Sequence, residues 1–163
     1  MADQRGAAVS RALALHATSE VQPQPDLGRS RRPALHPVSP DASDLIDHDG
    51  AFYVRALLEE LNLRPAELAK ALGIRAQQVH SWLKDSAVRP TTAGAQELLG
   101  QLVKTAVFLR ALFPEDQRGQ RQLWLRQPQI GFKGDSALEL LLGGQGGRVL
   151  DVLYELVTGD IST

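Results

Sequence analysis

The sequence predicts an all-α fold. Apolar residues recur at helical spacing in several segments, and proline, glycine and capping residues separate these segments from one another. No segment shows the alternation of apolar and polar residues that is typical of a half-buried strand. With 163 residues, the chain is long enough for one ordinary domain, or for one small domain with appendages.

The composition excludes several classes of protein. The formal charge is −1, so any binding to nucleic acid must depend on local geometry rather than on bulk charge. The absence of cysteine excludes a disulfide framework and a thiolate zinc site. No apolar run approaches the ~18–20 residues of a membrane span, and the N-terminal residues lack the continuous apolar core of a secretion signal. We therefore expect a soluble, cytoplasmic protein without a membrane partner.

Residues 1–49 are expected to form a flexible tail. Prolines interrupt this stretch repeatedly, and its few apolar residues follow no sustained period. A short helix over residues 7–15 would need a docking surface to be stable. Arg29, Arg31 and Arg32 are either an arm for the minor groove of DNA or, as we favour, a solvated charge cluster, because aspartates follow closely.

A first folded domain is expected over residues 50–112. Its first helix has apolar residues at positions i, i+3, i+4 and i+7, the period of a helix with one buried face. These residues are Val54, Leu57, Leu58 and Leu61. We expect Glu59 and Glu60 on the outer face of the same helix. A long helix with a sustained apolar stripe then begins near Thr92 and ends near Phe113.

Between these two helices, residues 65–83 predict two short helices joined by a turn. Pro65 suits the first helical position, and Gly73 can end the first helix in the left-handed conformation. Val79 and Trp82 are expected to be the buried residues of the second helix. Its outer side carries hydrogen-bonding and cationic residues, which suit base edges and phosphates in a major groove. The predicted DNA-binding residues are Arg75, Gln77, Gln78, His80, Ser81 and Lys84.

The spacing of Ala69, Gly73, Val79 and Trp82 resembles that of Xre-type (phage-repressor-like) DNA-binding domains. A helical hairpin without DNA-binding activity needs similar small and apolar residues, but we favour the DNA-binding interpretation. Arg64 stands before the first of these helices, where Ser or Thr would be the better cap. Arg75 breaks the same rule at the second helix, and both departures put cations where phosphates can lie.

The second domain is expected over residues 113–163. A short helix begins at Pro114 and ends before Gln127, since Pro128 disfavours helix at the preceding residue. Ser136 and Glu139 form a capping box at the start of another helix.

Five residues, Gly143–Gly147, then interrupt the chain. We interpret them as a flexible connection rather than a phosphate-binding loop, because no strand precedes them and no Gly-Lys-Ser/Thr follows. A final helix ends at Gly159 and carries an apolar stripe. The stripe consists of Val149, Val152, Leu153 and Leu156.

The order of residues in this second half resembles the toxin-binding domain of Xre/MbcA/ParS antitoxins. The resemblance rests on Trp124-Leu125, Gln127-Pro128, Gly134, Ser136 with Leu138-Glu139-Leu140-Leu141, the Gly-rich break, and Val149, Leu153 and Gly159. In that family a helix-turn-helix precedes this module, as residues 51–83 do here. The resemblance covers about two-thirds of the chain and stops at the proline-rich tail. Ala137 departs from the proline that is frequent in the family, and the long N-terminal extension is absent from its compact members.

The resemblance implies a partner. These antitoxins cover the NAD pocket of RES-domain toxins, which consume NAD, and the complex represses its own promoter through the helix-turn-helix. We therefore expect a RES-domain toxin and operator DNA as partners, in a homodimer or a larger assembly with the toxin. Residues 128–134 and the Gly-rich connection are expected to reach into the toxin. The predicted toxin-binding residues are Phe132, Lys133, Arg148 and Ile161, although Phe132 can equally belong to the core.

No pattern in the sequence predicts an enzyme, a cofactor or a metal site. The four histidines are scattered, and none is spaced from another as metal ligands are. No serine pairs with a His/Asp set. Two functions remain, an antitoxin and a free-standing helix-turn-helix regulator whose C-terminal helices only dimerise.

Overall fold

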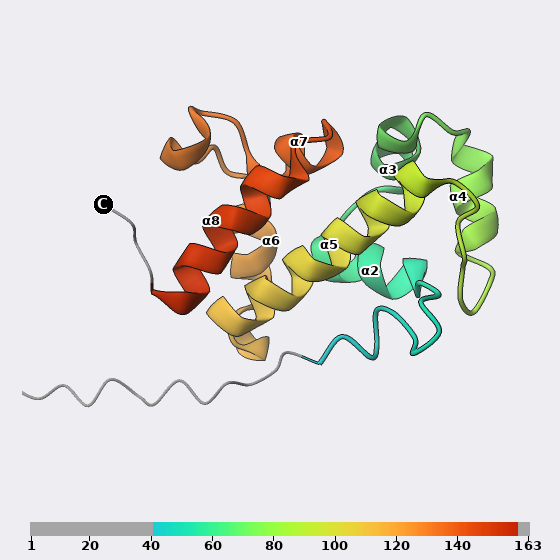
Figure 1. Ribbon diagram of the computed structural model, residues 1–163, viewed down its shortest axis with the longest axis horizontal. Coiled ribbons are helices and arrows are strands. Elements are labelled where there is room, and N and C mark those ends of the chain that lie inside the picture. Colours follow the sequence, from blue (N-terminus) through green and yellow to red (C-terminus); the bar gives the residue numbers. More distant parts are fainter. Residues whose placement is uncertain (1–40, 160–163) are drawn as a thin grey trace, which may run out of the picture. The chain divides into compact units, whose positions relative to one another are not determined.

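The computed structural model describes residues 41–159 (Figure 1). Within this range the regular elements are all helical, and β-type pairing is limited to isolated bridges. The expected all-α class is therefore confirmed for the described part of the chain. The expected helix over 7–15, the arginine cluster of the tail, and Ile161 lie outside the described residues.

The first two helices are α2 (Val54–Leu61) and α3 (Pro65–Leu72). Helix α2 ends where Asn62 adopts the left-handed conformation, with φ of 52°. At the start of α3, the Glu67 carboxylate accepts a hydrogen bond from the backbone N–H of Arg64 at 2.8 Å. This acid in the first turn supplies a cap that the Arg64 side chain cannot supply.

Helix α4 (Ala76–Trp82) follows α3 after a tight turn. Gly73 begins the turn with φ of 65°, a conformation that glycine adopts without a Cβ penalty. Val79 is fully buried and lies on the inner side of α4, where that helix packs against α3. The expected pair of short helices joined by a turn is therefore present.

The longest helix is α5 (Ala93–Leu112). Thr92 caps it, since its hydroxyl accepts a hydrogen bond from the N–H of Ala95 at 3.3 Å. A single 3-10 turn, η1 (Glu115–Gln117), leads into α6 (Arg118–Arg126). Both ends of the expected long helix agree with the structure.

The C-terminal elements are η2 (Ile130–Phe132), α7 (Ala137–Leu142) and α8 (Gly146–Thr158). The expected capping box at α7 is confirmed. The hydroxyl of Ser136 accepts from the N–H of Glu139 at 3.2 Å, and the N–H of Ser136 donates to the Glu139 carboxylate at 2.8 Å.

The connection between α7 and α8 is shorter than expected. Gly146 and Gly147 belong to the first turn of α8, so only residues 143–145 join the two helices. Gly146 is buried so closely against α5 that an added side chain would collide with Gln101. The expectation of a flexible connection through Gly147 is therefore wrong at its C-terminal end.

Order begins earlier than the predicted boundary near Gly50. Leu45 is completely buried, and residue Ile46 pairs with Phe52 in an isolated bridge. Two guanidinium nitrogens of Arg110, in the last turns of α5, donate to the Asp44 carboxylate at 2.8 and 2.7 Å. Residues 41–49 are therefore part of the helical body and not part of a tail.

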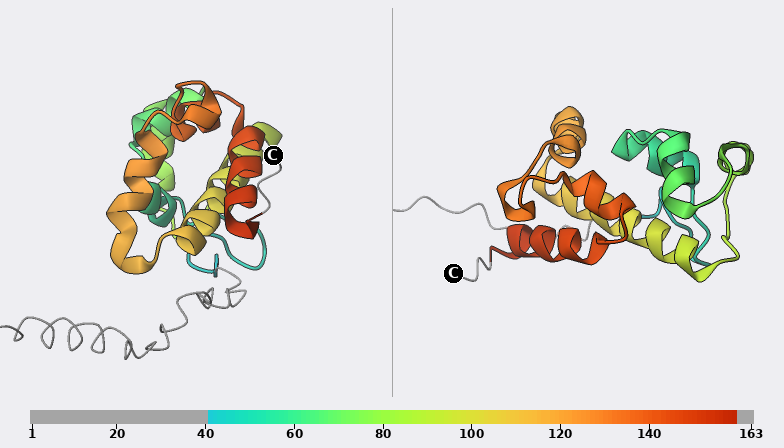
Figure 2. Two further views of the ribbon diagram at one scale, coloured as in Figure 1. Left: turned by 90° about the vertical axis from the view of Figure 1, so that its left-hand side faces the viewer. Right: turned by 90° about the horizontal axis from the view of Figure 1, so that it is seen from above.

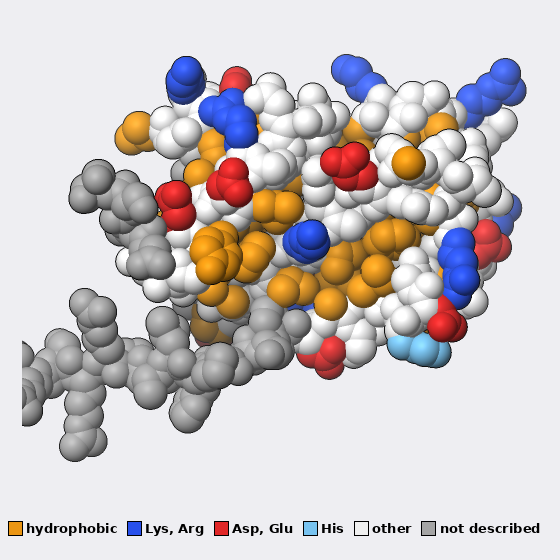
Figure 3. All heavy atoms as spheres, viewed as in Figure 1, with side chains coloured by type: hydrophobic (Ala, Val, Ile, Leu, Met, Phe, Trp, Pro, Cys, Tyr) orange, Lys and Arg blue, Asp and Glu red, His pale blue; other side chains and the backbone are white. Residues whose placement is uncertain are grey.

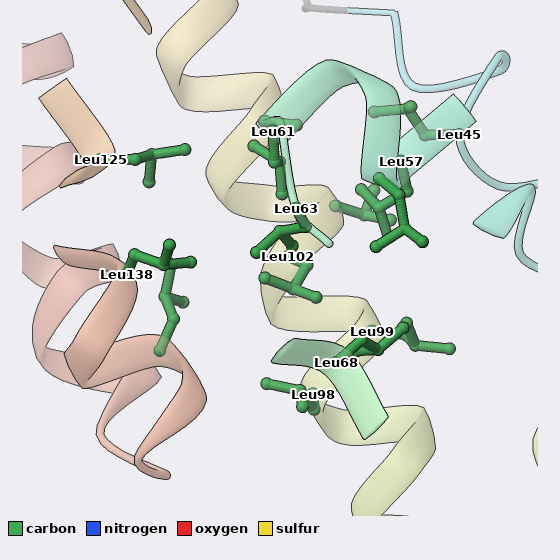
Figure 4. Close-up of a cluster of buried hydrophobic side chains, with 14 of the residues drawn as sticks. Leu45, Leu57, Leu61, Leu63, Leu68, Leu98, Leu99, Leu102, Leu125 and Leu138 are labelled. Atoms are coloured by element: carbon green, nitrogen blue, oxygen red, sulfur yellow. The ribbon is translucent and has the colours of Figure 1, made fainter. Parts of the chain in front are cut away.

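Helix α5 is the central element of this body (Figures 1 and 2). Helix α8 lies alongside α5, and α2, α3, α6 and α7 also pack against it. The core side chains come from elements throughout residues 41–159, and Figure 4 labels leucines of this core from Leu45 to Leu138. Burial of such a side chain contributes roughly 1.5–3 kcal/mol, so this shared core is the main source of stability. The division into domains at residue 112 stays a prediction.

One residue of the predicted stripe on α8 departs from expectation. Val149 and Leu153 are fully buried and Val152 is half-buried, but Leu156 is 45% exposed. Figure 3 shows that apolar side chains also reach the surface on the face that carries α5 and α8. In the described part of the chain, no helix is long and apolar enough to cross a membrane.

Candidate functional site

The predicted DNA-binding residues all lie on the exposed side of α4 or at its ends. They are Arg75, Gln77, Gln78, His80, Ser81 and Lys84. Within residues 41–159, none of these side chains has a hydrogen bond or an ion pair. Their donors and acceptors are therefore available to an external ligand at no cost in lost internal contacts.

Helix α4 is held from its opposite side. Val79 is fully buried, and the Arg55 guanidinium donates to the carbonyl of Leu83 at the end of α4, at 2.6 and 3.2 Å. Trp82, expected to be a core residue, is only half-buried and packs against the margin of the core. The expectation that Trp82 is a buried core residue is therefore wrong in degree.

The segment that carries α4 is locally positive although the whole chain is nearly neutral. Between residues 70 and 85 the chain carries Lys70, Arg75 and Lys84 against a single carboxylate, that of Asp85, a local balance of 3 − 1 = +2. Glu67, in the preceding helix, is neutralised by contacts with arginines elsewhere. Phosphate groups are attracted to such a local excess of positive charge.

The second candidate surface is the loop of residues 128–136, between α6 and α7. Its ends pair through an isolated bridge between Pro128 and Ser136. The N–H of Gln129 donates to the carbonyl of Asp135 at 3.0 Å, and its side-chain amide donates to the carbonyl of Trp124 at 3.2 Å. These bonds close the loop and attach it to α6.

Phe132 is not available as an apolar anchor for a partner. Its side chain is 1% exposed and meets the Trp124 ring edge-on, with ring centroids 6.4 Å apart. The exposed apolar residue of this loop is Ile130, which is 99% exposed. Both residues flank Gly131, and only the position of Trp124 in the folded protein decides which of them points inward.

Two of the other predicted toxin-binding residues, Lys133 and Arg148, lie within the described part of the chain. Lys133 and Arg148 are exposed, and one guanidinium nitrogen of Arg148 donates to the side chain of Gln145 at 2.8 Å. Ile161 lies outside the described residues.

Sequence patterns missed a buried charge cluster around Glu60. This carboxylate, expected on an outer face, is 6% exposed and lies 3.2 Å from Nε of Arg110 and 3.3 Å from Nη2 of Arg121. Arg118 approaches it at 3.8 Å. The Arg121 side chain is 2% exposed, and its Nε has no partner among the described residues. The expectation of an outer position is wrong, because the arginines of α5 and α6 cover this side of α2.

A second ion pair joins α6 to α3. Two guanidinium nitrogens of Arg126 donate to the Glu67 carboxylate, each at 3.1 Å. The hydrogen bonds from Arg126, and then those from Arg64, lower the pKa of Glu67 to about 2. We call this pair and the cluster around Glu60 the charged seam, since together they attach α6 to α2 and α3.

The side of the charged seam around Glu60 lies beneath a surface groove. A surface groove of about 720 Å³ runs over Glu60, Arg110, Arg118 and Arg121. Carboxylates inside the same groove pair with these arginines, including Glu115, which accepts a hydrogen bond from Arg121 at 3.0 Å that lowers the pKa of Glu115. In the part of the chain described, no group of His, Cys, Asp and Glu residues could hold a metal ion.

The two candidate surfaces lie at opposite ends of the helical body. Figure 1 shows α4 at one end, and the loop between α6 and α7 at the other, and the view from above in Figure 2 agrees. No protein-family model and no curated protein sequence matches the chain.

Proposed function

We propose that the protein is an antitoxin that blocks the NAD pocket of a RES-domain toxin and represses its own operon by binding operator DNA through α4. The observation that carries the DNA-binding half is the outer side of α4, where six hydrogen-bonding or cationic side chains have no partner among residues 41–159. The toxin-binding half rests on the resemblance of residues 113–163 to antitoxins of this kind. The chain itself performs no catalysis and uses no cofactor in this proposal.

The arrangement of side chains on α4 supports the proposed DNA-binding role. A helix in the major groove contacts base edges with a few side chains on one face, while cations near its ends contact phosphates. Gln77, Gln78 and His80 supply the hydrogen-bonding groups on α4, and Arg75 and Lys84 flank it. The separation of the two surfaces at opposite ends supports an assembly in which toxin and operator are bound at once.

Co-expression tests the toxin-binding half of the proposal. The full chain is produced together with the protein encoded by the neighbouring reading frame, and growth and cellular NAD are measured. The expected result is that the neighbour alone depletes NAD and stops growth, and that co-expression restores both. Unrestored growth, or a neighbour that leaves NAD unchanged, would exclude the antitoxin role.

Binding to the promoter region of the operon tests the DNA-binding half. Gln77→Ala and His80→Ala should each lose about 1–3 kcal/mol of discrimination between operator and unrelated DNA, if each contacts a base. Gln120→Ala is the matched control, because Gln120 is also an exposed glutamine whose side chain has no partner in the described part of the chain, but it lies on α6. If all three variants bind the operator equally well, then α4 does not contact the operator.

A free-standing transcriptional regulator is the second candidate. Tyr154 and Leu156 are large apolar residues exposed on α8, at 57% and 45%, and such residues are frequent in dimer interfaces. In this case the chain would be a dimer that binds DNA, and co-expression would not change the growth of cells that contain the neighbouring protein.

A further inference from the structure

The side chain of Ile130 has no structural role in the described protein. It is 99% exposed, whereas the other large exposed apolar residues within residues 41–159 are between 45% and 57% exposed. An apolar side chain that stays fully in water contributes nothing to folding through burial. The favourable free energy of burying this side chain is therefore available in full to the binding of a partner.

The backbone that carries Ile130 is already ordered. The N–H of Gly134 donates to the carbonyl of Gln129 at 3.2 Å, and the N–H of Lys133 donates to the carbonyl of Ile130 at 3.0 Å. Phe132, buried against Trp124, fixes the inner side of the same turn. A partner therefore does not have to order this loop, which removes one of the main entropic costs of association.

Lys133 adds an independent observation. Its φ is 59°, and Asn62 is the other described non-glycine residue with a positive φ. Asparagine tolerates the left-handed conformation because its side chain can hydrogen-bond locally, whereas the Lys133 side chain makes no hydrogen bond with a described residue. The Lys133 side chain is exposed and has no partner within residues 41–159. Backbone strain at an exposed, unpartnered side chain is typical of binding sites.

A protein pocket fits these two residues better than a lipid surface. A single myristoyl chain, far more apolar than one isoleucine, gives only marginal binding to membranes. One isoleucine with one cation is a typical anchor of a protein interface, in which a buried centre is surrounded by polar contacts.

We infer that Ile130 is the central anchor by which this protein holds its toxin, and that Lys133 pairs with a carboxylate at the rim of the toxin pocket that receives it. This inference rests on the proposed antitoxin function and names the contact that it requires. The toxin surface must then offer an apolar recess of isoleucine size with an acidic residue beside it.

The affinity of full-length variants for the toxin encoded by the neighbouring reading frame tests the inference. Ile130→Ser should weaken binding by about tenfold or more, with an unchanged melting temperature, because the side chain has no contact to lose in the free protein. Lys133→Gly should weaken binding by about threefold to tenfold while its melting temperature stays equal or rises, since glycine adopts the left-handed conformation freely. These opposite effects on binding and stability distinguish lost recognition from misfolding.

Leu123→Ser is the matched control for Ile130→Ser. Leu123 is a 47% exposed aliphatic residue on α6, and its replacement should change toxin affinity by less than about twofold. Equal losses at both positions, or unchanged affinity of Ile130→Ser, would overturn the assignment of Ile130 as the anchor. If the unaltered chain itself does not bind the toxin, then the proposed function fails and not only its anchor.

Sedimentation with lipid vesicles tests the alternative that the loop containing Ile130 binds a membrane. The unaltered chain should not sediment with vesicles of phosphatidylcholine and phosphatidylserine. Sedimentation that Ile130→Ser abolishes would show that the loop binds membranes and would overturn the inference. Operator binding by Ile130→Ser should equal that of the unaltered chain, because α4 lies at the other end of the helical body.

Discussion

Two helices of the C-terminal half are attached to the rest of the protein by different kinds of contact. Helix α8 packs on α5 through apolar residues, among them Leu153 and the edge-on pair of Phe108 and Tyr154, whose ring centroids are 6.4 Å apart. Helix α6 contributes the buried Leu125 to the core, and its further attachment to α2 and α3 is through the charged seam. The first attachment depends on buried area, and the second depends on every charged partner being present.

This difference between apolar and charged contacts predicts different responses to substitution and to pH. Apolar contacts lose stability in proportion to the atoms removed, and pH hardly affects them. A buried ion pair gains little over an apolar replacement, but removal of one partner leaves the other charged and desolvated. The charged seam should therefore be the more sensitive of the two to single substitutions and to acid.

The largest effect is expected for Glu60→Gln. The substitution leaves Arg110 and the nearly inaccessible Arg121 without their shared carboxylate, so we expect a loss of about 3–5 kcal/mol in the free energy of unfolding, measured by urea denaturation. Glu59→Gln is the matched control, because Glu59 is exposed and its side chain has no partner among the described residues; it should change stability by less than about 0.5 kcal/mol. Similar values for the two variants would contradict the role of Glu60.

Leu153→Ala should have a comparable or slightly smaller effect on the apolar attachment. Leu153 is fully buried on α8, and truncation of such a leucine costs about 2–5 kcal/mol. The loss should be the same at pH 7 and at pH 4, because no charge is involved. Leu156→Ala, on the exposed side of the same helix, should cost less than about 1 kcal/mol. A strong pH dependence of the destabilisation by Leu153→Ala would contradict the distinction between the apolar attachment of α8 and the charged attachment of α6.

Acid should weaken the charged seam through Glu67. Its pKa in the folded protein is about 2, against 4.5 for an unperturbed glutamate, so the carboxylate stabilises the fold fully above about pH 4.5. This contribution, on the order of 1–3 kcal/mol, is lost as pH falls towards 2. Urea denaturation at several pH values should show Glu67→Gln less stable than the unaltered chain at pH 7 and equally stable near pH 2. A stability difference that stays constant with pH would refute the assignment.

The smallest effect is expected for Gly146→Ala, at the tightest approach of α8 to α5. The new methyl group would displace the end of the Gln101 side chain, which is flexible, and alanine favours the helix over glycine. The two effects oppose each other, so the free energy of unfolding, measured by thermal denaturation, should change by no more than about 1 kcal/mol. Gly146→Leu cannot be accommodated in this way and should be clearly destabilised.

Local signals in the sequence were sufficient for most helix boundaries. Gly73, Thr92 and Ser136 each act on neighbouring residues, so their effect can be derived without knowledge of the fold. The outward position of the polar residues on α4 follows from the same kind of reasoning. Their contact with DNA, and the contact of the C-terminal half with a toxin, remain predictions.

Long-range contacts explain what the sequence could not reveal. Glu60 is buried by arginines of which the nearest along the chain, Arg110, is 50 residues away. Phe132 points inward because Trp124 offers it a surface, and no helical period governs a single 3-10 turn. Leu45, which with Ile46 forms a short apolar pair between Asp44 and Asp47, is buried in the core built by the helices that follow it. Each of these positions depends on tertiary packing rather than on local pattern.

The distance along the chain between the charged partners affects how the protein can fold during synthesis. When Asp44 and Glu60 are added to the growing chain, Arg110 is still 66 and 50 residues from being made. Until α5 emerges, both carboxylates stay hydrated, and α2 cannot bury the side that carries Glu60. The α2–α4 segment therefore reaches its final packing only after α5 and α6 have been translated, so a ribosome-bound chain ending before Arg110 should remain sensitive to protease.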